Sequence, residues 1–125
     1  MKYDPHKPID LVAWLEIDES QRIDSVRQYH QRQRIRLPNN NIHAIIHVVV
    51  ENQVAMGDDY PAKSVLLRLM NEGLDRHEAV HAIGSVLAEE IFDVLKRKTS
   101  GTDLIAQYLE KLNRLTAESW RKLAP

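Results

Sequence analysis

The sequence predicts an all-α fold, a single domain of about five helices with no sheet, covering residues 1–125 with a core over about residues 9–122. A chain of 125 residues is long enough to build one hydrophobic core. Residues that cap or stop helices separate the longer segments, so that the helices can be placed in order. Apolar residues recur in these segments at helical spacing, as in Val80, Ile83, Leu87, Ile91 and Val94.

Two helices are predicted in the first third of the chain. Residues 8–17 form a short lead-in helix, and Asp18 caps a second helix that runs from Glu19 to about Arg36. The inner line of this second helix is close to heptad spacing and consists of Ile23, Val26, His30, Gln33 and Leu37. Its opposite side is basic and carries Arg22, Arg27, Arg32, Arg34 and Arg36.

Residues 42–56 have features of both a helix and a strand. Their many Ile and Val residues favour a strand by propensity. We predict a helix because about fifteen residues are long for a strand, and because the histidine pair of this segment has a counterpart in a clearly helical context. Pro38 ends the preceding helix, and Asn41 is expected to cap this one.

Three further helices are predicted in the second half. The first covers residues 62–72, begins at the Pro61 turn and ends at Gly73 in the C′ position. The second covers residues 75–98, with Asp75 as N-cap and Glu78 at the third helical position, a capping-box pattern. The third covers residues 103–122.

Composition excludes several classes of function. The net charge is −1, from 17 basic and 18 acidic residues, which argues against binding nucleic acid over the whole surface. The chain has no Cys, so that disulfides, thiolate nucleophiles and thiolate metal sites are excluded. The N-terminus lacks the apolar run of a signal peptide, and no segment is apolar enough to span a membrane, so we expect a cytoplasmic protein. The sequence allows a homo-oligomer but does not determine the oligomeric state.

Two matched histidine pairs point to a metal site. His43 and His47 stand four residues apart, as do His77 and His81, and Glu51 extends the first pair by one further turn. An α-helix places residues i and i+4 on one face, so each pair can hold one ion. We therefore predict that the two helices share one zinc or iron site. Because imidazole binds metal only in its neutral form, the metal is expected to leave between pH 7 and 5.

The other polar residues near this site have open roles. Glu51 is a ligand together with His47, part of a second metal site, or a hydrogen-bond acceptor for a histidine N–H. His30 points inward, and for this single histidine we favour a hydrogen-bonded core position. His6 is expected to lie far from the site.

Two alternatives compete with a shared metal site. The run His77-Glu-Ala-Val-His81 also fits the zinc-protease string with Glu78 as general base, but Glu78 is already explained as a capping residue. A non-catalytic interaction module is the alternative from another class, in which the Arg-rich face of residues 22–36 binds an acidic protein or nucleic acid. A shared metal site would allow hydrolytic or oxygen chemistry, and the sequence does not indicate which of the two applies.

The combined motifs resemble a known family. They are His43-x3-His47-x3-Glu51-x-Gln53, the turn at Pro61, and the run from Glu72 to His81. This string is similar to a bacterial family catalogued as domain of unknown function 1841, over roughly residues 14–96. The resemblance implies a small helical bacterial protein of uncharacterised activity in which the two histidine segments belong to one unit. It implies no catalytic residues.

Overall fold

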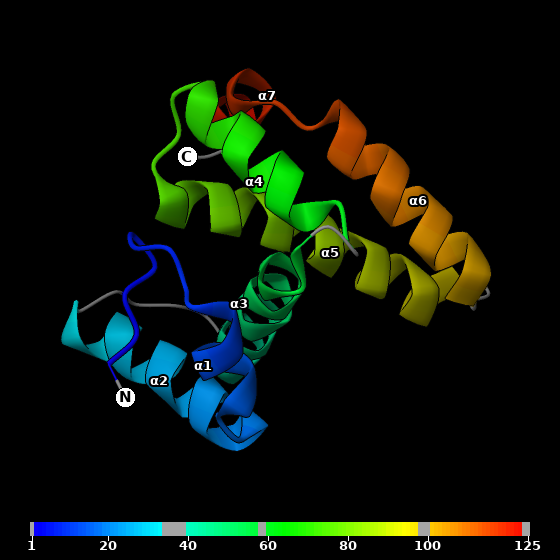
Figure 1. Cartoon of the computed structure of the whole chain (residues 1–125). Coiled ribbons are helices and arrows are strands. Elements are labelled where there is room, and N and C mark those ends of the chain that lie inside the picture. The colour runs from blue at the N-terminus through cyan, green and yellow to red at the C-terminus, as the bar shows by residue number, and fades with distance from the viewer. Residues whose placement is uncertain (1, 34–39, 58–59, 98–100, 124–125) are drawn as a thin grey trace.

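Helix α3 (Asn40–Ala55) lies at the centre of the fold, between the N-terminal helices and the later helices (Figure 1). The computed structural model describes residues 2–33, 40–57, 60–97 and 101–123. Within these ranges the chain forms helices and no strand, which confirms the predicted all-α class. The other helices are α1 (Leu11–Glu16), α2 (Glu19–Arg32), α4 (Ala62–Asn71), α5 (Arg76–Arg97), α6 (Gly101–Arg114) and α7 (Ala117–Leu123). None of the described helices is both long and apolar enough to cross a bilayer.

The apolar core consists of two clusters, and α3 contributes to both. The first cluster joins α3 to the N-terminal segment, α1 and α2 through Tyr3, Trp14, Val26, Tyr29 and Val48. The second cluster joins α3 to α4, α5, α6 and α7 through Val50, Leu69, Ile83, Leu112 and Ala117. The polar groups described below lie where α2, α3 and α5 meet, between these two clusters.

A glycine allows the two histidine-bearing helices to approach closely. A Cβ atom at Gly84 of α5 would lie 3.2 Å from Ile46 Cγ2 and 3.8 Å from Val50 Cγ2, both on α3. Even a methyl group at this position would require Ile46 to shift by a few tenths of an ångström. Gly84 therefore helps to set the spacing between the two histidine pairs.

Several predicted helix ends are confirmed. Asp18 caps α2, and Asp75 caps α5 by accepting a hydrogen bond of 2.7 Å from the Glu78 N–H. Helix α4 ends at Asn71 with Glu72 as C-cap, and Gly73 follows in the predicted C′ position, where its φ of 111° lies in the left-handed region that glycine adopts easily. The Leu74 N–H then donates to the Leu69 carbonyl at 3.1 Å, which completes a Schellman motif.

The predicted number of about five helices was too low, since the described residues form seven. The predicted helix over residues 103–122 is in fact α6 and α7, which are separated at Leu115 and Thr116. Thr116 and Ser119 each donate a backbone N–H to the other's hydroxyl oxygen at 3.0 Å. This reciprocal pair caps α7 in the manner of a capping box. The short Thr-Ala-Glu-Ser stretch is the sequence signal for this cap, which the prediction of one continuous helix missed.

Predictions around the α2–α3 connection are only partly correct. Helix α2 ends at Arg32 with Gln33 as its C-cap, and Gln33 is exposed rather than inward-facing. Leu37, Pro38, Arg34 and Arg36 lie outside the described residues. Asn41 lies within α3 rather than before it, and its side-chain oxygen accepts a hydrogen bond of 3.1 Å from Arg27.

Candidate metal centre

The two predicted histidine pairs converge. The ring centroid of His47 on α3 lies 5.4 Å from that of His77 and 5.2 Å from that of His81, and both of these histidines are on α5. The ring centroids of His77 and His81 are 4.2 Å apart, and that of His43 is 4.8 Å from His81. The structure thus brings together the two segments that the sequence paired, because α3 and α5 pack against each other through the faces that bear these residues.

A third helix adds a histidine to this cluster. His30 of α2 is buried, and its ring centroid lies 5.3 Å from that of His47 and 5.4 Å from that of His77. One ring nitrogen from each of His30, His47, His77 and His81 lies within 4.8 Å of the other three. We call these four residues the histidine cluster. His43 lies outside this group of four, with its Nε2 at 3.2 Å from His30 Nε2.

A hydrogen bond to the backbone orients His30. Its Nδ1 lies 2.9 Å from the Val26 carbonyl oxygen, which can only accept, so that Nδ1 carries the proton. Neutral His30 therefore keeps a lone pair on Nε2. The neighbouring His43 Nε2 must then donate its proton to His30 Nε2 across the 3.2 Å contact. His30 thus combines the hydrogen-bonded core role that we predicted with a place in the histidine cluster.

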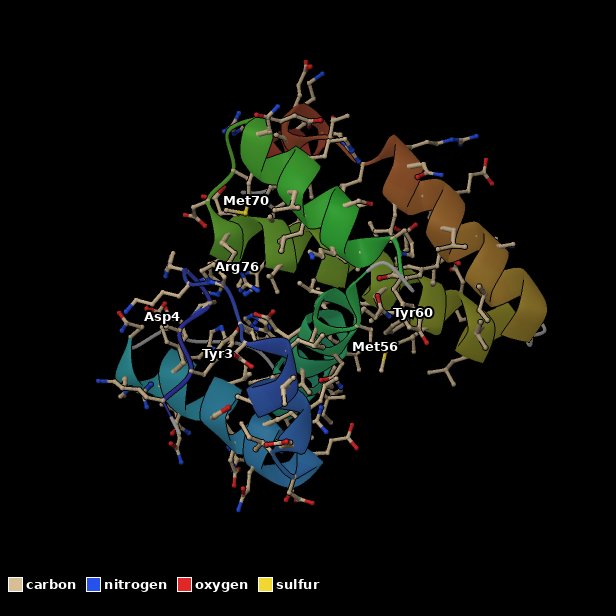
Figure 2. All side chains as sticks on the ribbon, in the orientation of Figure 1. Tyr3, Asp4, Met56, Tyr60, Met70 and Arg76 are labelled. Atoms are coloured by element: carbon tan, nitrogen blue, oxygen red, sulfur yellow. The ribbon has the colours of Figure 1, made fainter. Side chains whose placement is uncertain are left out.

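A buried chain of hydrogen bonds orients His47. The bidentate ion pair of Glu51 with Arg76 has N–O distances of 2.8 and 2.9 Å, and the Tyr3 hydroxyl donates to the same carboxylate. Because this hydroxyl proton is given to Glu51, the Tyr3 oxygen accepts the proton of His47 Nε2, 2.8 Å away. The lone pair of neutral His47 is therefore on Nδ1. Tyr3, on the N-terminal segment, and Arg76, at the start of α5, lie in the same region of Figure 2.

Three nitrogen atoms of the histidine cluster have no hydrogen-bond partner. They are buried and belong to the described residues: His47 Nδ1, His77 Nε2 and His81 Nε2. A buried polar atom without a partner loses the stabilisation that water would give it, and such atoms are rare in native proteins. An ion held between these rings would satisfy all three atoms at once.

Two acidic residues singled out from the sequence lie away from the unpaired nitrogens. Glu51 is fully buried, and its carboxylate is occupied by Arg76 and Tyr3, so that it acts on His47 through the Tyr3 hydroxyl. Glu51 thus accepts from Arg76 and Tyr3, and not directly from a histidine N–H as in the hydrogen-bonding role considered for it. Glu78 is exposed to solvent, on the outside of α5. The zinc-protease interpretation, which requires Glu78 beside the metal, has no support from this position.

The histidines of this region are held in the neutral form. Burial, and to a smaller extent the neighbouring imidazoles, lower the pKa of His43 and of His77 to about 4 and that of His81 to about 3. Burial also lowers the pKa of His30 and of His47. Neutral imidazole is the form that binds a metal ion.

We expect metal-free protein to lose stability as the pH falls from about 6.5, the ordinary pKa of histidine, to about 4. In this interval the unfolded chain binds protons at its histidines and the folded chain does not, so that protonation favours unfolding. Urea denaturation of metal-free protein at several pH values between 7.5 and 4 measures the effect. A double variant, His77→Gln and His81→Gln, should show a weaker pH dependence. Equal urea midpoints at pH 7 and pH 4.5 would contradict the prediction.

These pKa values also change the expected release of metal. The interval of pH 7 to 5 predicted from the sequence assumes the ordinary histidine pKa. Since the folded protein binds these protons only near pH 4, an ion held by these residues would be released below pH 5.

The structure corrects the prediction for His6. It was expected to lie far from the site, but its ring centroid is 5.4 Å from that of His77. The N-terminal segment brings it there, because the Pro5 carbonyl accepts a hydrogen bond of 2.9 Å from Arg76 at the start of α5. His6 is itself exposed and is not one of the four residues of the histidine cluster.

The arginine face of α2 is partly engaged within the molecule. Arg22 donates to the Asn52 side-chain oxygen at 2.8 Å. Arg27 pairs with Asp24 and also contacts Asn41. Of the five arginines in the predicted face, Arg34 and Arg36 lie outside the described residues. Of the three described arginines, Arg22 and Arg27 are thus engaged within the molecule, and Arg32 is exposed.

Comparison with protein-family models, with curated proteins and with solved structures finds no match to this chain. The class of site defined by the fold and geometry is a cluster of four neutral histidines, between three helices, that could hold a metal ion.

Proposed function

We propose that this protein binds one zinc or iron ion at His30, His47, His77 and His81. The observation that carries the proposal is the set of three buried, unpaired ring nitrogens within one cluster. The hydrogen bonds of His30 to Val26 and of His47 to Tyr3 support it, because each leaves the lone pair on the ring's other nitrogen. Ligands separated by up to 4.8 Å must move slightly closer, since ring nitrogens bound to one ion at about 2.1 Å lie about 3–4 Å apart.

The donor set favours transition metals. All four ligands are imidazole nitrogens, which suit zinc, iron, copper and nickel rather than magnesium or calcium, and the nearby Glu51 carboxylate is already paired with Arg76. A tetrahedral zinc ion with four protein ligands has no open position, which is typical of a structural site. An iron ion accepts further ligands and leaves room for a substrate or oxygen. The metal that binds therefore decides between a structural role and hydrolytic or oxygen chemistry.

The resemblance to the bacterial family of unknown function agrees with this proposal and does not add to it. It concerns a stretch, roughly residues 14–96, that contains every residue of the histidine cluster. We propose membership of that family on the motifs given above.

Elemental analysis of untagged protein tests the proposal. We expect about one equivalent of zinc or iron after purification, or after reconstitution with Zn²⁺ or with Fe²⁺ under anaerobic conditions. His47→Ala and His81→Ala should each abolish stoichiometric binding. Glu78→Gln is the matched control, because Glu78 lies between His77 and His81 in sequence but is exposed, and this variant should keep its metal. Absence of metal in the reconstituted wild-type protein would refute the proposal.

A further inference from the structure

A cavity of about 340 Å³ borders the histidine cluster between α3, α5 and α7. This volume is at the lower end of the range for small-molecule sites. Its walls are mostly apolar and include Ile46, Val80, Ala88 and the indole of Trp120. Gly84 also lines it.

The polar end of this cavity is formed by histidines. His47 and His81, which belong to the histidine cluster, line the cavity together with His43. Two of the three unpaired nitrogens, His47 Nδ1 and His81 Nε2, thus belong to residues that the cavity contacts. A molecule in the cavity would have an apolar body against the helices and a polar group towards the cluster.

The charge of the site indicates the sign of that polar group. Four neutral imidazoles leave a divalent ion with its full charge of two. The buried Glu51 carboxylate cannot balance it, because that carboxylate forms a bidentate ion pair with Arg76. A small anion in the cavity would compensate part of this charge.

His43 supplies a hydrogen-bond donor at the same place. In the structure its Nε2–H donates to the lone pair of His30 Nε2 at 3.2 Å. An ion that takes this lone pair removes the acceptor, so that the His43 N–H is left to donate to another group. His43 lines the cavity, and a carboxylate oxygen there could accept a hydrogen bond from this N–H group.

We propose that the cavity binds a small organic carboxylate with an apolar body, whose carboxylate lies beside the positively charged metal site and accepts a hydrogen bond from His43. This inference rests on the proposed metal site. It goes further by assigning the cavity, the chemical class of its ligand, and a separate role for His43 as the residue that contacts the ligand instead of the metal.

The test compares phenylacetate with acetate on zinc-loaded protein of known metal content. We expect isothermal titration calorimetry to show phenylacetate binding about tenfold or more tightly than acetate, because its ring is buried in the apolar cavity. Trp120 lines the cavity, so phenylacetate should also change its fluorescence. His43→Ala should keep the zinc but bind phenylacetate several-fold more weakly. Equal affinities for the two carboxylates would overturn the inference.

Ala88→Phe fills the cavity without changing any residue of the histidine cluster. We expect this variant to keep one equivalent of zinc and to lose the preference for phenylacetate. Ile91→Phe is the matched control, because Ile91 is an exposed residue of α5 that does not line the cavity. A protein that binds zinc but does not prefer phenylacetate, or whose preference survives Ala88→Phe, refutes this inference alone. A protein that binds no metal refutes the proposed function as well.

Discussion

The Arg76→Met variant should be destabilised by about 3–5 kcal/mol, the usual cost of leaving a buried charge without its partner. Glu51 is fully buried, and Arg76 contacts both of its carboxylate oxygens. Methionine has a similar length but no charge, so that the buried carboxylate keeps only its hydrogen bond from Tyr3. Urea denaturation of metal-free wild-type and variant proteins at pH 7.5 measures the difference in the free energy of unfolding.

Two further variants make this prediction specific. Arg114→Met removes an ion pair on the surface, in which Arg114 is 78% exposed, and should change stability by less than about 1 kcal/mol. Adding Glu51→Gln to Arg76→Met should recover part of the lost stability, because a neutral amide is less costly to bury than a carboxylate. If Arg76→Met is as mild as Arg114→Met, the Glu51–Arg76 pair does not hold the N-terminal segment, α3 and α5 together.

The His30→Ala variant should lose metal affinity by at least about 100-fold, whereas His43→Ala should keep one equivalent of metal. His30 is one of the four residues whose nitrogens gather, and its Nδ1 bond to Val26 leaves the lone pair on Nε2, where an ion would replace the hydrogen bond from His43. His43 contacts His30 but is not among those four. Competition with a chromophoric zinc chelator measures both affinities.

Circular dichroism and urea denaturation of the metal-free variants serve as the control, since His30 is buried and its loss leaves a small cavity. A His30→Ala protein that folds but does not bind supports the assignment. Normal binding by His30→Ala together with loss of binding by His43→Ala would restore the ligand set predicted from the sequence, His43, His47, His77 and His81.

Much of this site could be predicted because its geometry is local. Residues four apart on a helix share a face whatever the rest of the fold does. His43 and His47 therefore had to lie together, as did His77 and His81, and the apolar stripes turned α3 and α5 towards each other. The caps at Asp18 and Asp75 and the end at Gly73 are also local, since each depends on backbone groups within a few residues.

The Tyr3–Glu51–Arg76 network could not be predicted in this way. Its members are separated by 48 and 25 residues along the chain, and no periodic pattern links them. The same is true of His6, which the N-terminal segment carries close to His77. Sequence periodicity gives the direction of a side chain within its own helix, but it gives no information on where an irregular segment will lie.

The sequence by itself determined the all-α class, several helix ends and the two histidine pairs, because these features follow from helix geometry and from backbone hydrogen bonds over a few residues. Tertiary structure alone decided which histidines meet. It placed His30 of α2 in the cluster and left His43 at its edge, and it turned Glu51 towards Arg76. The physical reason is that these choices depend on how α2, α3, α5 and the N-terminal segment pack, and packing is fixed by contacts between residues distant in sequence.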